Sequence, residues 1–206
     1  MTSLVVFGAG GRAGQRILAE AARRELKTTA AVREPAKYPH ISGAVVVAGD
    51  ATDAESVARV AHGHDVAVSA VYSAELDTAD YAEAMKALLA GLERAGVQRL
   101  LMIGIATTLP AEDGEGMAFE RLDLPAEWRP FLQARADELQ VLRAYDGPVD
   151  WVVFAPPMEL VDEEGDSRYQ IRNFGNRLTY AALANAILDE AAANRHHRTQ
   201  LGISGS

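Results

Sequence analysis

The first residues whose types and spacing could do chemistry are glycines close to the N-terminus. They lie in the stretch Gly8-Ala9-Gly10-Gly11-Arg12-Ala13-Gly14. Glycines at this spacing allow a tight turn and let the backbone approach a phosphate group without a Cβ in between. Where such a turn opens a helix, the first N–H groups have no partners within the helix and carry partial positive charge. The stretch therefore predicts a binding site for a diphosphate.

The glycine spacing fits two registers of a dinucleotide-binding turn. Gly8, Gly10 and Ala13 fit the pattern G-x-G-x-x-A. Gly8, Gly11 and Gly14 fit a second pattern, G-x-x-G-x-x-G. Either pattern is informative only between a strand and a helix. Residues 4–7 are apolar and predict a buried strand, and the residues from 15 onwards predict a helix, so both registers point to a dinucleotide.

The choice of dinucleotide depends on the residues that end the second predicted strand. An Asp or Glu at this position binds the ribose hydroxyls of NAD, whereas an Arg can pair with a 2′-phosphate. Here the strand ends in Arg33, and Arg12 in the glycine turn and Lys37 are further cations. Glu34 follows directly, so Arg33 could also be only a solvated charge. The sequence favours NADP(H) over NAD(H).

Two more pairs of residues follow predicted strands and are candidates for the cofactor. Asp50 and Ala51 come just after the strand predicted over residues 44–48 and are candidates for the adenine. Asp50 could instead be a turn or capping residue. Ala70 and Val71 end the next strand, where small side chains would let a cofactor lie over the strand ends.

Hydroxyl groups and a proline follow the later strand ends. Tyr72 and Ser73 could touch cofactor or substrate, although Tyr72 could also be a half-buried packing residue. Thr107 and Thr108 could each place a hydroxyl near the nicotinamide, and Thr108 is the preferred one, the alternative being a local cap. Pro156 could form a rigid wall beside the nicotinamide or simply end its strand.

The elements that must position these residues alternate between strand and helix, which predicts an α/β fold with a mostly parallel sheet and helices on both faces. The strand at 44–48 is uniformly apolar, as is typical of strands covered on both faces. Segments 107–128 and 158–177 read as irregular, apart from a short strand near 168–172. The predicted strands are 4–7, 28–33, 44–48, 65–71, 97–105, 149–155 and 200–203. The predicted helices begin at 15, after a cap at Thr52 or Asp53, at 81, at 131 and after a cap at Thr179, and the helix from 81 ends at Gly96.

Composition narrows the classes of function. The chain has 206 residues, which suits a single domain over 1–206, and 49% of them are hydrophobic. The net charge of -9 argues against a nucleic-acid partner. With no cysteine and no long apolar run, the sequence predicts neither disulfides nor a membrane partner, and a cytoplasmic location. The adjacent His196 and His197 do not share a helix face, so no metal site is predicted. We expect a monomer or a small homo-oligomer that binds a small-molecule acceptor.

Four stretches together resemble a known family. They are residues 8–14, 32–35, 49–53 and 154–157. In these the chain resembles the atypical short-chain dehydrogenase/reductases, and most of all the small NAD(P)H-binding proteins of the NmrA-like or NADH-flavin reductase type, which are relatives of biliverdin-IXβ/flavin reductase. The resemblance covers essentially the whole chain and implies a doubly wound Rossmann domain with a short C-terminal substrate region.

The resemblance also implies roles for residues at matching positions. It assigns the pyrophosphate to Gly8, Gly11, Arg12, Ala13 and Gly14, the 2′-phosphate to Arg33, the adenine to Asp50 and Ala51, and the ribose and nicotinamide side to Ala70, Val71 and Ala106.

One departure from the family pattern bears on the reaction. The Tyr-x-x-x-Lys proton-donor pair of these enzymes should lie on the helix after the fifth strand. That helix offers Phe131 and Arg135, which have no phenolic hydroxyl and no proton that is readily lost. We therefore expect an NADPH-dependent reductase of a planar conjugated acceptor such as a flavin or quinone. The alternatives are a non-catalytic NADP(H) sensor and an isomerase or epimerase.

Overall fold

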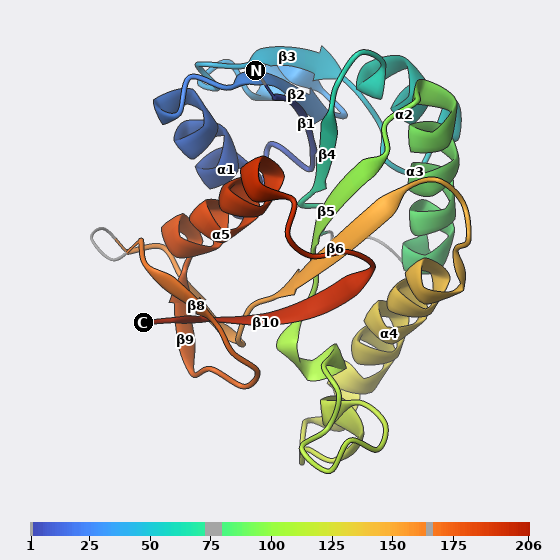
Figure 1. Ribbon diagram of the computed structural model, residues 1–206, viewed down its shortest axis with the longest axis vertical. Helices are drawn as coiled ribbons and strands as arrows, with labels where there is room; N and C mark the ends of the chain where they lie inside the picture. The colour runs from blue at the N-terminus through green and yellow to red at the C-terminus, as the bar shows by residue number, and fades with distance from the viewer. Residues whose placement is uncertain (1, 73–79, 164–166) are drawn as a thin grey trace.

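The computed structural model describes residues 2–72, 80–163 and 167–206 (Figure 1). Ser73 lies outside these ranges. Within them the chain forms a sheet of eight strands in the order β3-β2-β1-β4-β5-β6-β10-β8. All neighbours are parallel except β10 and β8. The strands are β1 (Ser3–Phe7), β2 (Lys27–Val32), β3 (Val45–Ala48), β4 (Val66–Ser69), β5 (Arg99–Ile103), β6 (Asp150–Ala155), β8 (Tyr169–Ile171) and β10 (Thr199–Gly205).

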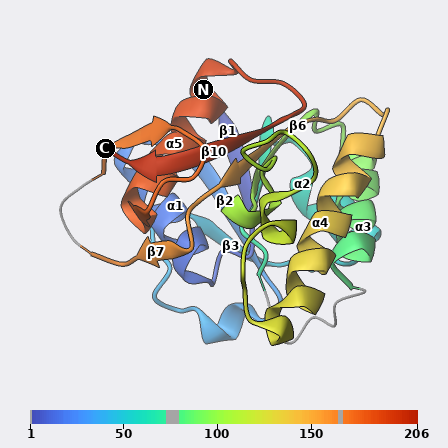
Figure 2. The same cartoon turned by 90° about the horizontal axis from the view of Figure 1, so that it is seen from below.

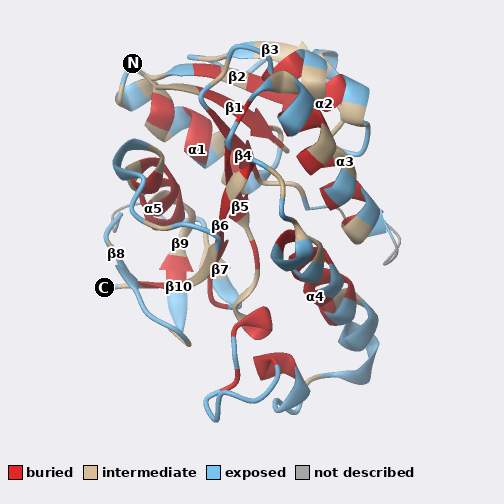
Figure 3. Cartoon of the chain, turned by 45° about the vertical axis from the view of Figure 1, so that its right-hand side comes forward, coloured by how far each residue is buried: buried red, intermediate tan, exposed pale blue. Residues whose placement is uncertain are grey.

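The helices cover both faces of this sheet, as predicted (Figures 1 and 3). On one face α1 and α5 bury side chains such as Ile17 and Leu183 against the sheet. On the other face α2, α3 and α4 bury Val57, Leu88 and Leu139. Both faces of the central strands are thus withdrawn from water, which accounts for their continuous apolar sequences. The helices are α1 (Arg12–Arg23), α2 (Ala54–Ala61), α3 (Asp80–Ala95), α4 (Arg129–Ala144) and α5 (Tyr180–Ala193).

Local sequence signals set the ends of several helices. The Asp53 carboxylate accepts a hydrogen bond from the Glu55 N–H at 3.0 Å and caps α2. Thr179 caps α5 by accepting from the Ala182 N–H at 3.0 Å. Gly96, with φ of 75°, ends α3, and Val97 N–H donates back to Leu92 O at 3.0 Å. These are the boundaries that the sequence predicts for α2, α3 and α5.

The structure corrects the prediction for three segments. β3 is an edge strand and Val45 is exposed, so its apolar run does not reflect cover on both faces. Residues 158–177 are more regular than expected, because β7 (Glu159–Val161) and β9 (Arg177–Thr179) pair in parallel there, and the short strand near 168–172 is β8. The loop over 107–128 contains short 3-10 helices, among them η2 (Ala106–Thr108) and η4 (Ala126–Trp128).

The strand order places the functional edge of the molecule. The order 3-2-1-4-5-6 makes the connections leave β1 and β4 in opposite directions, and ligands of such sheets bind beyond the carboxyl ends of the strands at this point. All six of these strands are parallel, so their carboxyl ends meet at one edge. Figure 2 shows α3 and α4 on one side of the sheet and α1 and α5 on the other. No helix among the described residues is long and apolar enough to cross a membrane.

Candidate functional site

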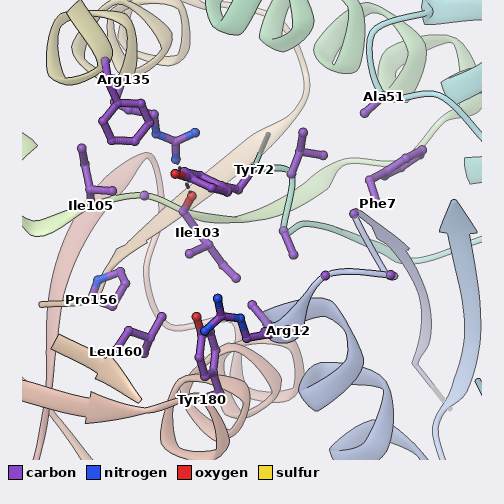
Figure 4. Close-up of a pocket in the computed structure, with 18 of the residues that line it drawn as sticks. Phe7, Arg12, Ala51, Tyr72, Ile103, Ile105, Arg135, Pro156, Leu160 and Tyr180 are labelled. Atoms are coloured by element: carbon purple, nitrogen blue, oxygen red, sulfur yellow. Dashed lines mark hydrogen bonds between the residues drawn. The ribbon is translucent and has the colours of Figure 1, made fainter. Parts of the chain in front are cut away.

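A cleft of about 1020 Å3 runs along the carboxyl edge of the sheet. Its walls come from the ends of the first six strands, from the N-terminal halves of α1 and α4, and from the start of α5 (Figure 4). At one end lies the glycine turn between β1 and α1, and at the other end aromatic side chains gather near α4. The two ends therefore differ in chemistry.

The glycine turn is shaped so that side chains would not fit. Gly8 has φ of +73°, and a Cβ there would lie 2.5 Å from the Ala70 carbonyl oxygen. A Cβ on Gly14 would lie 2.4 Å from the Gly8 carbonyl oxygen, so α1 can approach β1 only with glycine at this position. Gly11 is the N-cap of α1 and its N–H donates to Gly8 O at 3.1 Å. The close contact at Gly14 favours the register that ends at Gly14, but Gly10 of the other register also leaves no room for a Cβ, which would lie 2.3 Å from the Tyr38 ring.

The N-terminus of α1 provides donors for an anion at this end of the cleft. Glycine at the N-cap has no side chain that could occupy the first N–H groups of the helix, and they open onto the cleft beside Gly10, Arg12 and Ala13. In Figure 4 the Arg12 side chain extends from α1 toward Tyr180 at the start of α5. A diphosphate therefore fits this turn.

Residues after β2 and β3 form the outer wall of the same end. Arg33, Glu34 and Lys37 all line the cleft, and Lys37 Nζ lies 2.6 Å from Glu34 Oε1. This ion pair partly neutralises the carboxylate that follows Arg33. Asp50 lines the cleft as well, although its Oδ1 accepts hydrogen bonds from the Thr52 N–H and hydroxyl at 2.9 Å and 2.7 Å.

Between the glycine turn and the aromatic rim, the floor of the cleft is formed by the residues that follow the central strands. Ala70 and Val71 follow β4 and line the cleft, and their side chains are small. Ala106 is held beside β6, because its N–H donates to the Pro156 carbonyl at 3.0 Å. Gly104 is needed in the same segment, since a Cβ there would lie 2.5 Å from Val153 Cγ1.

The structure thus brings most of the predicted cofactor residues together. Ala9 and Gly14 do not line the cleft; Ala9 is buried, and Gly14 acts through the packing of α1. The predicted residues that line the cleft are Gly8, Gly10, Gly11, Arg12, Ala13, Arg33, Asp50, Ala51, Ala70, Val71, Ala106 and Pro156, together with Tyr72.

The structure does not bring Thr108 to the cleft. Its hydroxyl is buried, donates to Ile105 O at 2.9 Å and accepts from Gln200 Nε2 at 2.8 Å. The preference for Thr108 over its neighbour is therefore corrected, because the 3-10 turn of η2 points the two side chains in different directions. Thr107 lines the cleft, and its buried hydroxyl has no hydrogen-bond partner among the described residues.

The far end of the cleft has an apolar and aromatic rim. Tyr72 is 68% exposed, Met158 61% and Trp128 42%, which is unusual for large apolar side chains, and all three line the cleft. Phe131 supports the rim, since its ring packs edge-on against Tyr72 with centroids 5.9 Å apart. An exposed apolar rim of this kind suits a flat, apolar ligand.

A buried ion pair stands behind this rim. Arg135 lines the cleft with only 4% of its side chain exposed, and its Nη1 lies 2.8 Å from Glu138 Oε2. Its Nη2 donates to the Ile103 carbonyl at 2.7 Å (Figure 4). Burial raises the pKa of Glu138 to about 7, although the Arg135 charge lowers it.

The adjacent histidines lie at the opposite edge of the sheet, away from the cleft. His196 Nδ1 lies 2.7 Å from Glu190, and His197 Nδ1 lies 2.6 Å from Asp150. Arg99 bridges the same two carboxylates. Hydrogen bonds to these carboxylates therefore account for the positions of the two histidines. The described residues contain no cluster of three His, Asp or Glu side chains suited to a metal.

Sequence reasoning missed most of the rim. Trp128 and Met158 lie in segments that read as irregular, and such segments carry no period that would place a side chain. Tyr180 could have been found, because the Thr179 cap predicts a helix start directly before it. Tyr38 was also missed, and its ring lies so close to Gly10 that a Cβ there would be 2.3 Å from it.

Known proteins share this architecture along their full length. The protein YwnB of Bacillus subtilis (strain 168), itself uncharacterised, is 27% identical over 209 residues, 96% of each chain. A candidate epimerase from Bacteroides thetaiotaomicron is 26% identical with a TM-score of 0.86, over 98% of this chain and 96% of that one. A candidate NADH-flavin reductase from Streptococcus pneumoniae TIGR4 is 24% identical with a TM-score of 0.86, over 100% of both chains.

The sequence also matches a family that is defined by its cofactor. Residues 8–194 match the NAD(P)H-binding family, and this range begins at the first glycine of the turn. It includes every wall of the cleft apart from Phe7, so the family match and the geometry describe the same site. This protein belongs to the NAD(P)H-binding family, and its cofactor is a nicotinamide dinucleotide.

Proposed function

We propose that this protein is an NADPH-dependent reductase of a planar conjugated acceptor, such as a flavin or a quinone. The observation that carries the proposal is that one cleft joins a diphosphate cradle to a rim formed by Tyr72, Trp128, Phe131 and Met158. A dinucleotide that lies across the strand ends, with its phosphates at α1, would bring its nicotinamide to the side of this rim. A flat acceptor would stack there.

Two cations support NADPH as the preferred form. Arg33 lines the cleft directly after β2, where a 2′-phosphate would accept charge-assisted hydrogen bonds, and Arg12 lines it at the start of α1 with its side chain extended toward Tyr180. The nearby Glu34 would repel that phosphate, but its carboxylate pairs with Lys37. The cysteine-free composition suits a reducing compartment, and we propose the cytoplasm as the place of action.

The reaction needs no proton-donating side chain in the cleft, and the chain binds and orients the two reactants. The bound dinucleotide supplies the hydride. Residues Ala70, Val71 and Ala106 keep the floor low enough for two stacked rings, and Pro156 fixes the wall opposite. A ketone would need a positioned acid, which contributes typically ~10²–10⁴-fold. On α4 the places of that acid and its partner are taken by Phe131 and Arg135, whereas a conjugated ring can take its proton from solvent.

Turnover with a panel of acceptors tests this proposal. We expect NADPH oxidation with flavins and quinones, and little with simple ketones or secondary alcohols. Trp128→Ala should raise KM for the quinone, because it removes part of the stacking surface, and should leave NADPH affinity unchanged. Arg143→Ala on the exposed side of α4 is the matched control. Efficient, stereospecific reduction of an isolated carbonyl would contradict the proposal, with Tyr72 the first residue to examine as a hidden acid. Tight NADPH binding without turnover of any conjugated acceptor would make the protein a sensor.

A further inference from the structure

The feature of interest is the guanidinium that is buried in the wall of the cleft behind the aromatic rim. Three neighbours hold Arg135 in place. Nη2 donates to the Ile103 carbonyl at 2.7 Å, Cζ lies 5.1 Å from the centre of the Tyr81 ring, and Nη1 faces Glu138. Figure 4 shows the side chain reaching from α4 to the end of β5, beside Tyr72. A full positive charge is thus fixed at the acceptor end of the cleft.

Glu138 compensates the positive charge of Arg135 only in part. Nη1 of Arg135 and Oε2 of Glu138 are 2.8 Å apart, but they are not aligned as a hydrogen bond, and Oε2 has no other partner among the described residues. A buried carboxylate with so little support is costly to keep ionised. For this reason burial raises the pKa of Glu138 to about 7 even though Arg135 opposes the rise.

The other elements packed around this pair contribute few charges. From α3 the buried Tyr81 lies under Arg135, while Glu83 and Lys86 of the same helix are exposed and paired with each other at 2.7 Å. From η4 Glu127 lines the cleft, and from η2 Thr107 presents only a hydroxyl. Glu138 is therefore the ionisable group that stands nearest to the Arg135 charge.

We infer that Arg135 stabilises the negative charge that reduction places on the acceptor, and that Glu138 is a positioning residue whose ionisation sets how strongly it does so. This inference rests on the proposed function. Hydride transfer adds two electrons and one hydrogen to the acceptor ring, and the ring stays anionic until a proton arrives from solvent. A fixed cation whose own side chain is buried stabilises such a charge more than a fully solvated cation would.

The sign of the pH dependence follows from this arrangement. Below about pH 7 Glu138 is protonated, so the charge of Arg135 is unopposed and the acceptor anion is stabilised. Above about pH 7 the ionised Glu138 neutralises the charge of Arg135, and the acceptor anion loses that stabilisation. The rate of acceptor reduction should fall as the pH rises through this range.

The kinetics of the wild type and four variants give the first test. In the wild type kcat with a quinone should fall about tenfold from about pH 6 to about pH 8. Glu138→Gln keeps the shape without the charge, so this decline should disappear and the rate should stay at its low-pH level. The matched control Asp137→Asn, an exposed neighbour on α4 that pairs with Gln133, should keep the decline. Arg135→Met should lower kcat by about 10²-fold and flatten the profile, with part of the rate regained in Arg135→Lys.

Binding of an unreactive anion gives a test that does not need turnover. The protein loaded with NADP⁺ is titrated with the anion of a hydroxynaphthoquinone and with naphthoquinone itself. Affinity for the anion should fall as the pH rises through 7 in the wild type and not in Glu138→Gln, whereas the neutral quinone should show no such change. Melting temperatures confirm that each variant is folded.

The outcomes separate this inference from the proposed function. A wild type that reduces quinones, but binds the anion equally well at both ends of the pH range, would overturn the role of Arg135 and Glu138 and leave the reductase in place. The expected binding pattern without turnover would support the charged site and contradict the reductase. A decline in rate that persists in Glu138→Gln would also overturn the inference.

Discussion

At the scale of single residues, we propose that Arg33 sets the preference of the cleft for NADPH. Arg33 stands at the end of β2 in the position where NAD-dependent proteins use a carboxylate, and it lines the cleft together with Arg12. Its nearest acidic neighbour in sequence, Glu34, is turned to Lys37. The Lys37 ion pair thus partly neutralises Glu34 at this corner of the cleft, which supports our proposal that a 2′-phosphate binds against Arg33.

The first prediction concerns Arg33. Arg33→Ala should weaken NADPH binding by about tenfold or more, because a hydrogen bond to a charged group contributes roughly 1.5–3 kcal/mol. NADH binding should change little. Fluorescence titration of both cofactors measures the ratio, with Arg143→Ala as the control. Equal affinities for NADPH and NADH in the wild type would contradict the assignment, and an unchanged ratio in Arg33→Ala would transfer it to Arg12.

The second prediction concerns Gly14. A Cβ there would lie within 2.4 Å of Gly8 O and 2.7 Å of Ala9 Cα, and both are backbone atoms of the turn. Gly14→Val should lower the free energy of unfolding by ~1–3 kcal/mol and weaken dinucleotide binding. Ala19→Val, on the exposed face of the same helix, controls for the cost of a branched side chain. A Gly14→Val protein with normal melting temperature and NADPH affinity would show that the turn can adapt.

At the scale of elements, strands and helices could be predicted where the sequence has a clear apolar run or a clear capping residue. The apolar runs of the central strands, the caps Asp53 and Thr179 and the stop at Gly96 placed most strands and helices. β3 shows the limit of this reasoning, since an apolar run does not reveal which strand ends up at an edge. The aromatic rim shows another limit: Trp128 and Met158 depend on the path of irregular chain across the fold, which no local pattern encodes. The buried partnership of Arg135 with Glu138 is visible only as an i,i+3 spacing that many exposed pairs share.

The third prediction concerns the ion-pair network that joins β5, β6 and α5. Burial raises the pKa of Glu190, but the hydrogen bonds from His196 and the charge of Arg99 lower it overall. The pKa of Asp150 is lowered in the same way by His197, Arg198 and Arg99 against the effect of burial. Carboxylates with depressed pKa stabilise the fold at pH values above their unfolded pKa, and this stabilisation is lost as pH falls through the folded pKa.

We therefore expect the melting temperature to fall when the pH is lowered below about 4, the ordinary range of Asp and Glu pKa values. Glu190→Gln should remove part of this acid dependence and should cost about 3–5 kcal/mol near neutral pH, because it leaves Arg99 buried with a weaker partner. Glu112→Gln in the exposed loop is the matched control. If the melting temperature of Glu190→Gln falls in acid in the same way as that of the wild type, this network is not the source of the acid dependence.

At the scale of the whole molecule, the sheet order brings two kinds of surface into one cleft. The strand order around β1 and β4 fixes the dinucleotide end, and the segments that follow β5 and β6 provide the acceptor end (Figure 1). The dinucleotide end could be predicted because the glycines that shape it lie in one short stretch of sequence, residues 8–14. The acceptor end could not, because it is assembled from η4, α4 and the chain after β6, which are distant in sequence and meet only in the fold.

A crystal structure of the protein with NADPH and a quinone tests the central claim most directly. We predict a dinucleotide across the carboxyl ends of the strands, with its diphosphate at the N-terminus of α1, its 2′-phosphate against Arg33 and its nicotinamide beside Ala106 and Pro156. The quinone should stack on the nicotinamide, within the rim of Tyr72, Trp128 and Phe131. A dinucleotide bound in the opposite direction, or a quinone bound outside this rim, would contradict the account.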